Sequence, residues 1–445
     1  MKIPIRESPP EEVITKIRAM LKKYGFEELR SSSTEQVLSD YYEQEEKFNI
    51  FSRQALNIRN NNCSIDQLKS FTFILEKYLK GRTLYPLQLL SAYHLAFSQN
   101  ACNFSVPGSG KTSIVYGAYA YLKNIDDDAK KINRLLVIGP LSSFGPWELE
   151  YEECFGAKPI AKRLVGSLSR EEKISYLYSQ HPAELTLISY ASVPQIKDDL
   201  IRFLRNHEVM VVLDEAHKIK NTTGGITANA VLDIAQYCRS RVVLTGTPAP
   251  NGYEDLYNLF NFIWPYKNII KFQVNQLKDM SGRRNDPRVG ELLNSIAPFF
   301  IRIRKSDLRL PPVTVHPPII TEMGPIQRKI YSFIEKKYIE GLIDGKDLIS
   351  KFQSQLVKAK IVRLMQAASN PALLNFPLQE FLGEGYPEAS HIINDLEIVR
   401  DIASYQSKEI PSKFFETLKL VKNLLNRGHK VIIWASFIQT IHFLK

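Results

Sequence analysis

Short apolar runs alternate with helix-compatible stretches between residues 101 and 264, and this alternation limits the folds open to the chain. Strands that are apolar along most of their length, with helices between them, are typical of a parallel sheet covered on both faces. The predicted strands lie at 135–139, 185–189, 209–213 and 241–245. The predicted helices lie at 112–123, 146–155, 170–179, 194–205 and 226–237. The sequence therefore predicts an α/β fold whose ligands bind at the carboxyl ends of the strands.

The stretch SVPGSGKT, from Ser105 to Thr112, is typical of a phosphate-binding loop. Its glycines allow the backbone N–H groups to curl around a polyphosphate, and the helix that follows directs the positive end of its dipole at the same anion. Lys111 would reach the β- and γ-phosphates, and the Thr112 hydroxyl would hold a magnesium ion. The strict pattern has Gly where this chain has Ser105, so the stretch alone is also compatible with an ordinary Gly-Lys-Thr turn. The residues expected to bind ATP here are Pro107, Gly108, Ser109, Gly110, Lys111, Thr112 and Ser113.

A second motif, VMVVLDEAH, places Asp214 and Glu215 directly after a buried strand. Two adjacent carboxylates at such a position favour a bound cation, and nucleotide-bound magnesium supplies one. Asp214 would hold the metal, and Glu215 would orient and deprotonate the attacking water. His217 lies two residues further on, where it could sense the γ-phosphate. An Asp-Glu pair that caps a helix is the alternative, but the phosphate loop upstream favours the catalytic interpretation.

The next predicted strand ends in Thr245-Gly246-Thr247-Pro248. Thr and Gly at a strand end form a tight turn with free hydroxyls, which can bond to the Asp-Glu-Ala-His segment. We therefore expect Thr245 and Gly246 to couple the state of the nucleotide to movement elsewhere. Three such motifs in this order rarely occur together by chance.

The 445-residue chain has 58 Lys and Arg against 47 Asp and Glu, a net charge of +11. A basic excess of this size suits a polyanionic partner, nucleic acid before membrane, although solubility alone is an alternative. The four cysteines, at 63, 102, 154 and 238, lie far apart with no close pair, which favours reduced thiols over disulfides or a zinc site. The N-terminal segment is not a signal peptide, and no apolar run approaches the roughly 20 residues of a membrane span. A cytoplasmic or nucleoid-associated protein without a membrane partner is expected.

Together these motifs resemble the superfamily-two helicase-like ATPases and, within them, the Swi/Snf-type DNA translocases. Leu84 to Gln88 resembles the family's adenine-reading glutamine motif, which implies that Gln88 contacts the base. Pro140-Leu141-Ser142 with Trp147 and Glu150, Ile188-Ser189-Tyr190, and Asp214 to Asn221 are similar to the motifs that follow. The resemblance implies ATP and Mg²⁺ as cofactors and a RecA-like parallel sheet as the first lobe.

The likeness continues to the end of the chain. Phe300 to Pro312 resembles the arginine-rich connector between two lobes, with Ile303 where a second arginine is usual. Met323 to Tyr331, Leu364 to Leu374, and Gly428 to Trp434 resemble parts of a second RecA-like lobe with a helical protrusion. The expected organisation is a helical N-terminal layer at 1–80, a first lobe at 81–265, a protrusion and connector at 266–312, and an incomplete second lobe at 313–445.

Two departures from the family pattern stand out. The phosphate loop opens with Ser105-Val106-Pro107 instead of an acidic pair and a methionine, which indicates a divergent microbial branch. The chain ends at Lys445, one strand and part of a helix past the fourth motif, so the fifth and sixth motifs with their arginine fingers are expected in the remainder of the second lobe, in the same or another chain. An arginine finger contributes about 10³-fold or more to phosphoryl transfer. This chain alone is therefore expected to bind ATP and to hydrolyse it poorly.

The resemblance also implies a grip on double-stranded DNA through backbone phosphates, non-specific and salt-dependent. It places the DNA-binding loops at strand ends opposite the ATP cleft. The implied contacts are Leu141, Ser142, Ser189, Tyr190, Thr247 and Arg302. The main hypothesis is an ATP-dependent double-stranded DNA translocase. A nucleotide-dependent DNA-binding or scaffold protein without efficient hydrolysis, and a strand-separating helicase of a restriction or defence system, are the alternatives.

Overall fold

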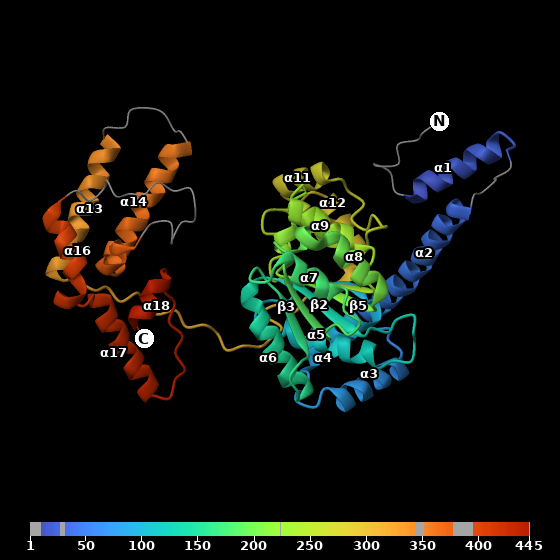
Figure 1. Cartoon of the computed structure of the whole chain (residues 1–445), viewed down its shortest axis with the longest axis horizontal. Helices are drawn as coiled ribbons and strands as arrows, with labels where there is room; N and C mark the ends of the chain where they lie inside the picture. The colour runs from blue at the N-terminus through green and yellow to red at the C-terminus, as the bar shows by residue number, and fades with distance from the viewer. Residues whose placement is uncertain (1–9, 27–31, 223, 344–350, 377–394, 445) are drawn as a thin grey trace. The chain divides into compact units, whose positions relative to one another are not determined.

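The computed structural model describes residues 10–26, 32–222, 224–343, 351–376 and 395–444. The chain divides into two compact units, Met1–Pro311 and Pro312–Lys445. The first unit contains a sheet with helices around it (Figure 1). The sheet has seven strands in the order β3-β4-β2-β5-β6-β1-β7, and every pairing is parallel. The predicted α/β fold with a parallel sheet is confirmed.

The strands alternate with helices along the chain, as the apolar pattern predicts. The strands are β1 (Asn100–Asn103), β2 (Arg134–Gly139), β3 (Ala161–Leu164), β4 (Leu185–Ser189), β5 (Val209–Asp214), β6 (Ser240–Leu244) and β7 (Phe300–Ile301). The helices of this part are α4 (Pro86–Ser98), α5 (Lys111–Lys123), α6 (Phe144–Phe155), α7 (Arg170–Leu177), α8 (Lys197–Asn206), α9 (Ile226–Ala235), α10 (Leu256–Ile263), α11 (Val274–Gly282) and α12 (Arg288–Ile296). The predicted strands correspond to β2, β4, β5 and β6. The apolar pattern did not predict β1, β3 and β7, because β1 (NACN) contains two asparagines, β3 (AKRL) carries two cations and β7 has two residues.

The two faces of the sheet are covered by two separate hydrophobic cores. Along β2, Leu135 and Val137 face the core that α4, α5 and α6 complete, whereas Leu136 and Ile138 face the core of α8, α9 and α10. Successive side chains of a strand point to opposite faces, so a strand buried on both faces must be apolar throughout. This requirement explains why the strand segments of the sequence are continuous apolar runs.

The N-terminal helices belong to the same unit as the sheet. They are α1 (Pro10–Lys23), α2 (Ser32–Arg59) and α3 (Ile65–Tyr78). Phe51 of α2 joins the core on one face of the sheet, and Ile58 of the same helix joins the core on the other. Phe71 of α3 is fully buried and packs edge-on against Tyr93 of α4, with ring centroids 5.3 Å apart. These contacts pack the C-terminal part of α2 and one face of α3, with Phe71 and Leu75 buried, into the cores of this unit.

The second unit is helical in its described residues. Its helices are α13 (Pro325–Ile343), α14 (Lys351–Ser369), α16 (Leu396–Lys408), α17 (Ser412–Asn426) and α18 (Ile438–Leu444). A small core around Ile330, Ala367 and Tyr405 holds α13, α14 and α16 together. The apolar run at 431–434 pairs with no strand of the described residues, and Trp434 is 91% exposed. An extended segment needs a neighbouring strand to pair its backbone groups, so it forms no sheet here. No helix among the described residues is long and apolar enough to cross a membrane.

Candidate nucleotide-binding site

Three neighbouring strands bring the sequence motifs together at one edge of the sheet. The sheet order places β6 between β5 and β1. The phosphate loop follows β1, Asp214 ends β5, and Thr245-Gly246 follows β6. All three strands are parallel, so these segments meet at the carboxyl edge, where ligands of such sheets bind.

The phosphate loop has the backbone that its glycines allow. Gly108 and Gly110 both have φ of +80°, in the left-handed region that other residues disfavour. The helix α5 begins at Lys111, directly after the loop. A Cβ atom on Gly110 would lie 2.2 Å from Nε2 of Gln88, so this glycine is also required by close packing. The loop therefore leads into a helix N-terminus that directs its free N–H groups toward the loop.

Two of the positions that depart from the family pattern, Ser105 and Ile303, are bonded to each other. The buried Oγ of Ser105 accepts a hydrogen bond of 2.9 Å from the Ile303 N–H. The Val106 N–H in turn donates to the Ile303 carbonyl at 3.1 Å. Ile303 is itself 3% exposed and packs in the core beneath α4 and α5. The segment after β7 thus fastens the start of the phosphate loop through backbone groups and one serine hydroxyl.

Lys111 lies within the electrostatic influence of the acidic pair. Its Nζ donates to the Ser105 carbonyl at 3.1 Å. Burial lowers the pKa of Lys111 below its usual value, while the nearby carboxylates of Glu215 and Asp214 oppose this effect. The structure therefore brings together the three charged groups that the sequence separates by about a hundred residues.

Asp214 is held by two aromatic side chains. The Nε1–H of Trp147 on α6 donates to Asp214 Oδ2 at 3.0 Å, and the hydroxyl of Tyr190 donates to the Asp214 carbonyl oxygen at 2.9 Å. Donors that bond a carboxylate fix its orientation and leave its other oxygen for a ligand. The sequence alone indicated no role for Trp147 at the site. Trp147 belongs to the segment after the second predicted strand that resembles a family motif. Its bond to Asp214 could not be predicted from that motif, because the two residues lie 67 positions apart.

Glu215 has an unusual backbone. Its φ of 52° and ψ of 50° place a non-glycine residue in the left-handed region, a conformation that concentrates at functional sites. Its Oε2 lies 3.2 Å from Nδ1 of His217. Glu215 and His217 thus contact each other, and both side chains are partly exposed at the carboxyl edge.

The turn after β6 reaches the phosphate loop. Thr245 is fully buried, and its N–H donates to the Asn103 carbonyl at the end of β1 at 3.2 Å. Its Oγ1 accepts from the N–H of Thr247 at 3.2 Å. A Cβ atom on Gly246 would lie 2.9 Å from Cδ of Pro107, so a side chain there would push against the loop. Thr245 and Gly246 therefore link β6 to the loop after β1.

Two of the residues expected to contact ATP are engaged with protein groups. Gln88 accepts from the Tyr85 N–H and donates to the Ser109 carbonyl, both at 3.0 Å, so it braces the loop. Ser113 is buried on α5, where its hydroxyl donates to Glu150 and lies 3.2 Å from an Arg82 guanidinium nitrogen. Thr112 is partly buried at the first turn of α5, and Ser109 has a buried hydroxyl without a hydrogen-bond partner in the described structure.

The expected DNA-binding loops do not lie opposite the phosphate loop, and that expectation is wrong. Gly139, which precedes Leu141 and Ser142, is paired with Ser189, and both end parallel strands of the same sheet. Thr247 follows β6 at the same edge. Because every strand runs in one direction, all of these loops share the carboxyl edge with the phosphate loop, displaced toward β2 and β4.

The same loops differ in what they leave accessible. Leu141, Ser142, Thr247 and Arg302 are exposed. Tyr190 is 8% exposed and its hydroxyl is bonded to Asp214, while Ser189 shares a 2.9 Å hydrogen bond with Ser192. Tyr190 is therefore placed to support Asp214 rather than to contact a nucleic acid.

Comparison with known proteins bears on the arrangement at this edge. The SNF2-related domain family matches residues 95–373, more than half of the chain. The chain belongs to this family. The matched segment begins on α4 and includes the phosphate loop, Asp214-Glu215 and the turn after β6. The predicted resemblance is confirmed at this level, and membership implies that the chain binds ATP.

Several relatives of this SNF2-related chain are about a quarter identical to it over the aligned residues. The ATP-dependent helicase FUN30 of Saccharomyces cerevisiae is 28% identical over 60% of the chain and 25% of its own length. The chromatin remodeling factor mit1 of Schizosaccharomyces pombe is 26% identical, over 83% and 25%. The human chromodomain-helicase-DNA-binding protein 8 is 26% identical, over 70% and 12%. The chain spans a quarter or less of the length of these relatives.

Among solved structures, the Sulfolobus solfataricus SWI2/SNF2 ATPase core in complex with dsDNA is similar to this chain. The TM-score is 0.43 at 21% identity, over 82% of this chain and 69% of that one.

Proposed function

We propose that this SNF2-related chain is the motor part of an ATP-dependent double-stranded DNA translocase. The observation that carries the proposal is the convergence of Lys111 with Asp214 and Glu215 at the carboxyl edge of the sheet. A lysine beside two carboxylates, next to a glycine loop and a helix N-terminus, provides the groups that a magnesium-bound nucleoside triphosphate requires.

Each group has a proposed role. Lys111 and the N–H groups of the loop bind the phosphates, and Thr112 and Asp214 fit a hard cation because both offer oxygen ligands. Magnesium, when bound, would neutralise charge that develops on the phosphates. Glu215 orients the attacking water and accepts its proton, with His217 beside it. Gln88, which braces the loop at Ser109, is placed at the loop where it could also reach the base.

Double-stranded DNA is the proposed track. The net charge of +11 favours a polyanion, and relatives of the chain are named chromodomain-helicase-DNA-binding proteins. The proposed contacts are the exposed residues Leu141, Ser142, Thr247 and Arg302, together with the partly buried Ser189. Arg288 is unsuited to this role, because it is ion-paired with Asp279 and Asp286.

Substitution of Lys111 tests the nucleotide site. Lys111→Ala is expected to abolish ATP binding, measured by titration calorimetry, because the phosphates lose their buried cation. Lys123→Ala, at the other end of α5 and paired with Glu184, is the matched control and should bind ATP like the wild type. Unchanged ATP affinity in Lys111→Ala would show that the nucleotide binds elsewhere.

Two assays separate translocation from unwinding. A translocase displaces the third strand of a triplex with ATP but does not open a forked duplex, whereas a strand-separating helicase opens the fork. DNA binding without DNA-stimulated hydrolysis would favour the nucleotide-dependent DNA-binding protein instead.

A further inference from the structure

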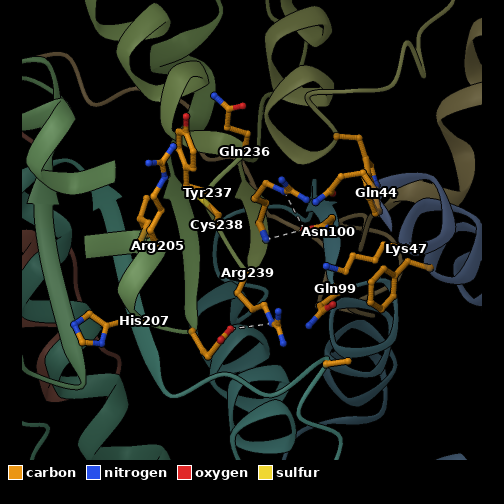
Figure 2. Close-up of a pocket in the computed structure, with 16 residues that line it drawn as sticks. Gln44, Lys47, Gln99, Asn100, Arg205, His207, Gln236, Tyr237, Cys238 and Arg239 are labelled. Carbon is orange, nitrogen blue, oxygen red and sulfur yellow. Dashed lines mark hydrogen bonds and ion pairs between the residues drawn. The ribbon is translucent and has the colours of Figure 1, made fainter. Parts of the chain in front are cut away.

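A polar pocket lies at the amino edge of the same sheet, away from the candidate nucleotide site. It has a volume of about 220 Å³. Its walls come from the segments that lead into β1, β5 and β6, and from the side of α2 (Figure 2). The motifs at the carboxyl edge leave this pocket unexplained, because none of its lining residues belongs to them.

The pocket carries an excess of positive charge. Lys47, Arg205, Arg239 and Arg241 line it, against the single carboxylate of Glu208. Glu208 is paired with Arg239, and Lys47 is paired with Glu43 on its own helix. Arg205 lies over the ring of Tyr237 at 4.4 Å. The carboxylates nearby are therefore fewer than the cations that face the pocket.

Arg241 is the unusual member of this group. It is 4% exposed, and it donates to Asn100 Oδ1 at 3.0 Å and to the Ala235 carbonyl at 2.9 Å. Its guanidinium lies 5.5 Å from the centre of the Trp264 ring. No carboxylate in the described part of the chain is within ion-pair distance of it, and burial lowers the pKa of Arg241 to about 10, which leaves it charged at neutral pH. A buried charge without a counter-ion is unfavourable unless an anion binds beside it.

Arg239 supplies an independent sign of a missing acceptor. Its buried Nε lies 2.9 Å from Glu208 Oε2 as an ion pair without a hydrogen bond, and its Nη2 donates to the Asp128 carbonyl. Figure 2 shows the side chains of Lys47, Gln99 and Arg239 directed toward the same space. Lys47 comes from α2, Gln99 from the end of α4, and Arg239 from the residue before β6. Lys47 and Arg239 thus present cationic nitrogens to one cavity from two separate elements, while the Nε2–H of Gln99 donates to the Lys130 carbonyl at 2.8 Å.

We propose that this pocket binds a small phosphate-bearing anion through Lys47, Arg239 and Arg241. Guanidinium groups match the oxygens of a phosphate, and charge-assisted hydrogen bonds to them are strong. The volume is below the roughly 300 Å³ at which drug-sized ligand pockets begin, so it suits orthophosphate, pyrophosphate or a compact phosphate ester and not a whole nucleotide. Because Lys47 lies on α2, a bound anion ties the N-terminal helices to the sheet.

Calorimetric titration of the full chain with pyrophosphate, and separately with orthophosphate, at fixed ionic strength tests the proposal. The titration is made in the Lys111→Ala background, which weakens competing phosphate binding at the carboxyl edge. The expected result is saturable binding to one site. Lys47→Gln combined with Arg239→Gln should weaken it by about tenfold or more, because two charge-assisted contacts are lost. Both side chains are partly exposed, so this variant retains the core.

Lys158→Gln combined with Arg202→Gln removes the same charge from exposed positions outside the pocket, and it should bind the anion like its parent. Equal weakening in this control would overturn the proposal, because the effect would then come from net charge. Absence of saturable binding would also overturn it and leave Arg241 a structural residue. Loss of duplex DNA binding in the pocket variant, without any binding of the free anions, would overturn it in favour of a DNA contact.

Discussion

The two edges of the sheet differ in the charges that surround their buried cation. At the carboxyl edge, Lys111 faces Asp214 and Glu215, so cation and anions are arranged together. At the amino edge, Arg241 is more deeply buried and has no carboxylate partner among the described residues. A site that already contains both signs suits a ligand with both, such as a nucleotide with magnesium, whereas a site with one sign suits a bare anion.

One helix joins the two edges. Gln88, in the first turn of α4, donates to the phosphate loop at Ser109, and Gln99, just after the last turn, lines the amino-edge pocket. The helix between them packs along α5 in a continuous core. The two edges therefore lie at opposite ends of one helix, which is packed into the core on one face of the sheet.

Glu215→Gln, a substitution at the carboxyl edge, should have the largest effect, and that effect is on the rate of ATP hydrolysis. Hydrolysis by the motor should fall about 10²–10⁴-fold, because the attacking water loses its general base, while ATP binding changes little. DNA-stimulated phosphate release and ATP titration measure the two quantities. Glu291→Gln, exposed on α12, is the control and should hydrolyse ATP at the parent rate. A Glu215→Gln variant with normal hydrolysis would remove Glu215 from the proposed chemistry.

His94, on the helix between the edges, predicts a pH dependence of stability. Burial lowers the pKa of His94 to about 4, from an unfolded value near 6.5. As the pH falls from 6.5 to 4, His94 binds a proton in the unfolded chain but stays neutral in the folded chain. The free energy of unfolding should therefore fall by roughly 3 kcal/mol. Denaturant unfolding at several pH values measures it. His94→Leu should lose this part of the slope, and an unchanged slope would contradict the assignment.

Trp147→Phe tests how the carboxyl edge is kept in order. The ring still packs edge-on against Tyr116, but Asp214 loses its 3.0 Å donor. The magnesium concentration for half-maximal hydrolysis should rise about 10–100-fold, since partners that orient a ligating carboxylate have effects of this size. Binding of magnesium-free ATP should change little. An equal loss of both would indicate a general disturbance of the loop instead of a positioning role for Trp147.

Ser105→Ala should have the smallest effect. It leaves the buried Ile303 N–H without its acceptor, which should lower the free energy of unfolding by about 1–2 kcal/mol. Chemical denaturation of the first unit measures the change. Ser167→Ala, exposed in the turn before α7 of the same unit, should leave stability unchanged. Stability equal to the wild type in Ser105→Ala would show that the loop is not fastened through this bond.

Much of the first unit could be predicted from local sequence. The apolar runs at β2, β4, β5 and β6 exceed what a helix face or an exposed strand needs, so they indicate strands buried on both faces. The phosphate loop before Lys111 and the acidic pair after β5 could also be predicted, because each motif lies within a few consecutive residues. The position of the proposed DNA-binding loops was predicted wrongly, because the resemblance gave residues but not the edge to which parallel strands deliver them.

The sequence by itself determined which segments form most of the strands, which loop can bind phosphates and which two carboxylates can act with that loop. Tertiary structure decided that Trp147 bonds Asp214, that Ser105 meets Ile303, and that Lys47 and Arg241 line one pocket. These pairs lie from 67 to 198 positions apart, and no local pattern relates their members. They meet because the strand order places β1 between β6 and β7 and lays the N-terminal helices along the sheet, which is a property of packing over the whole unit.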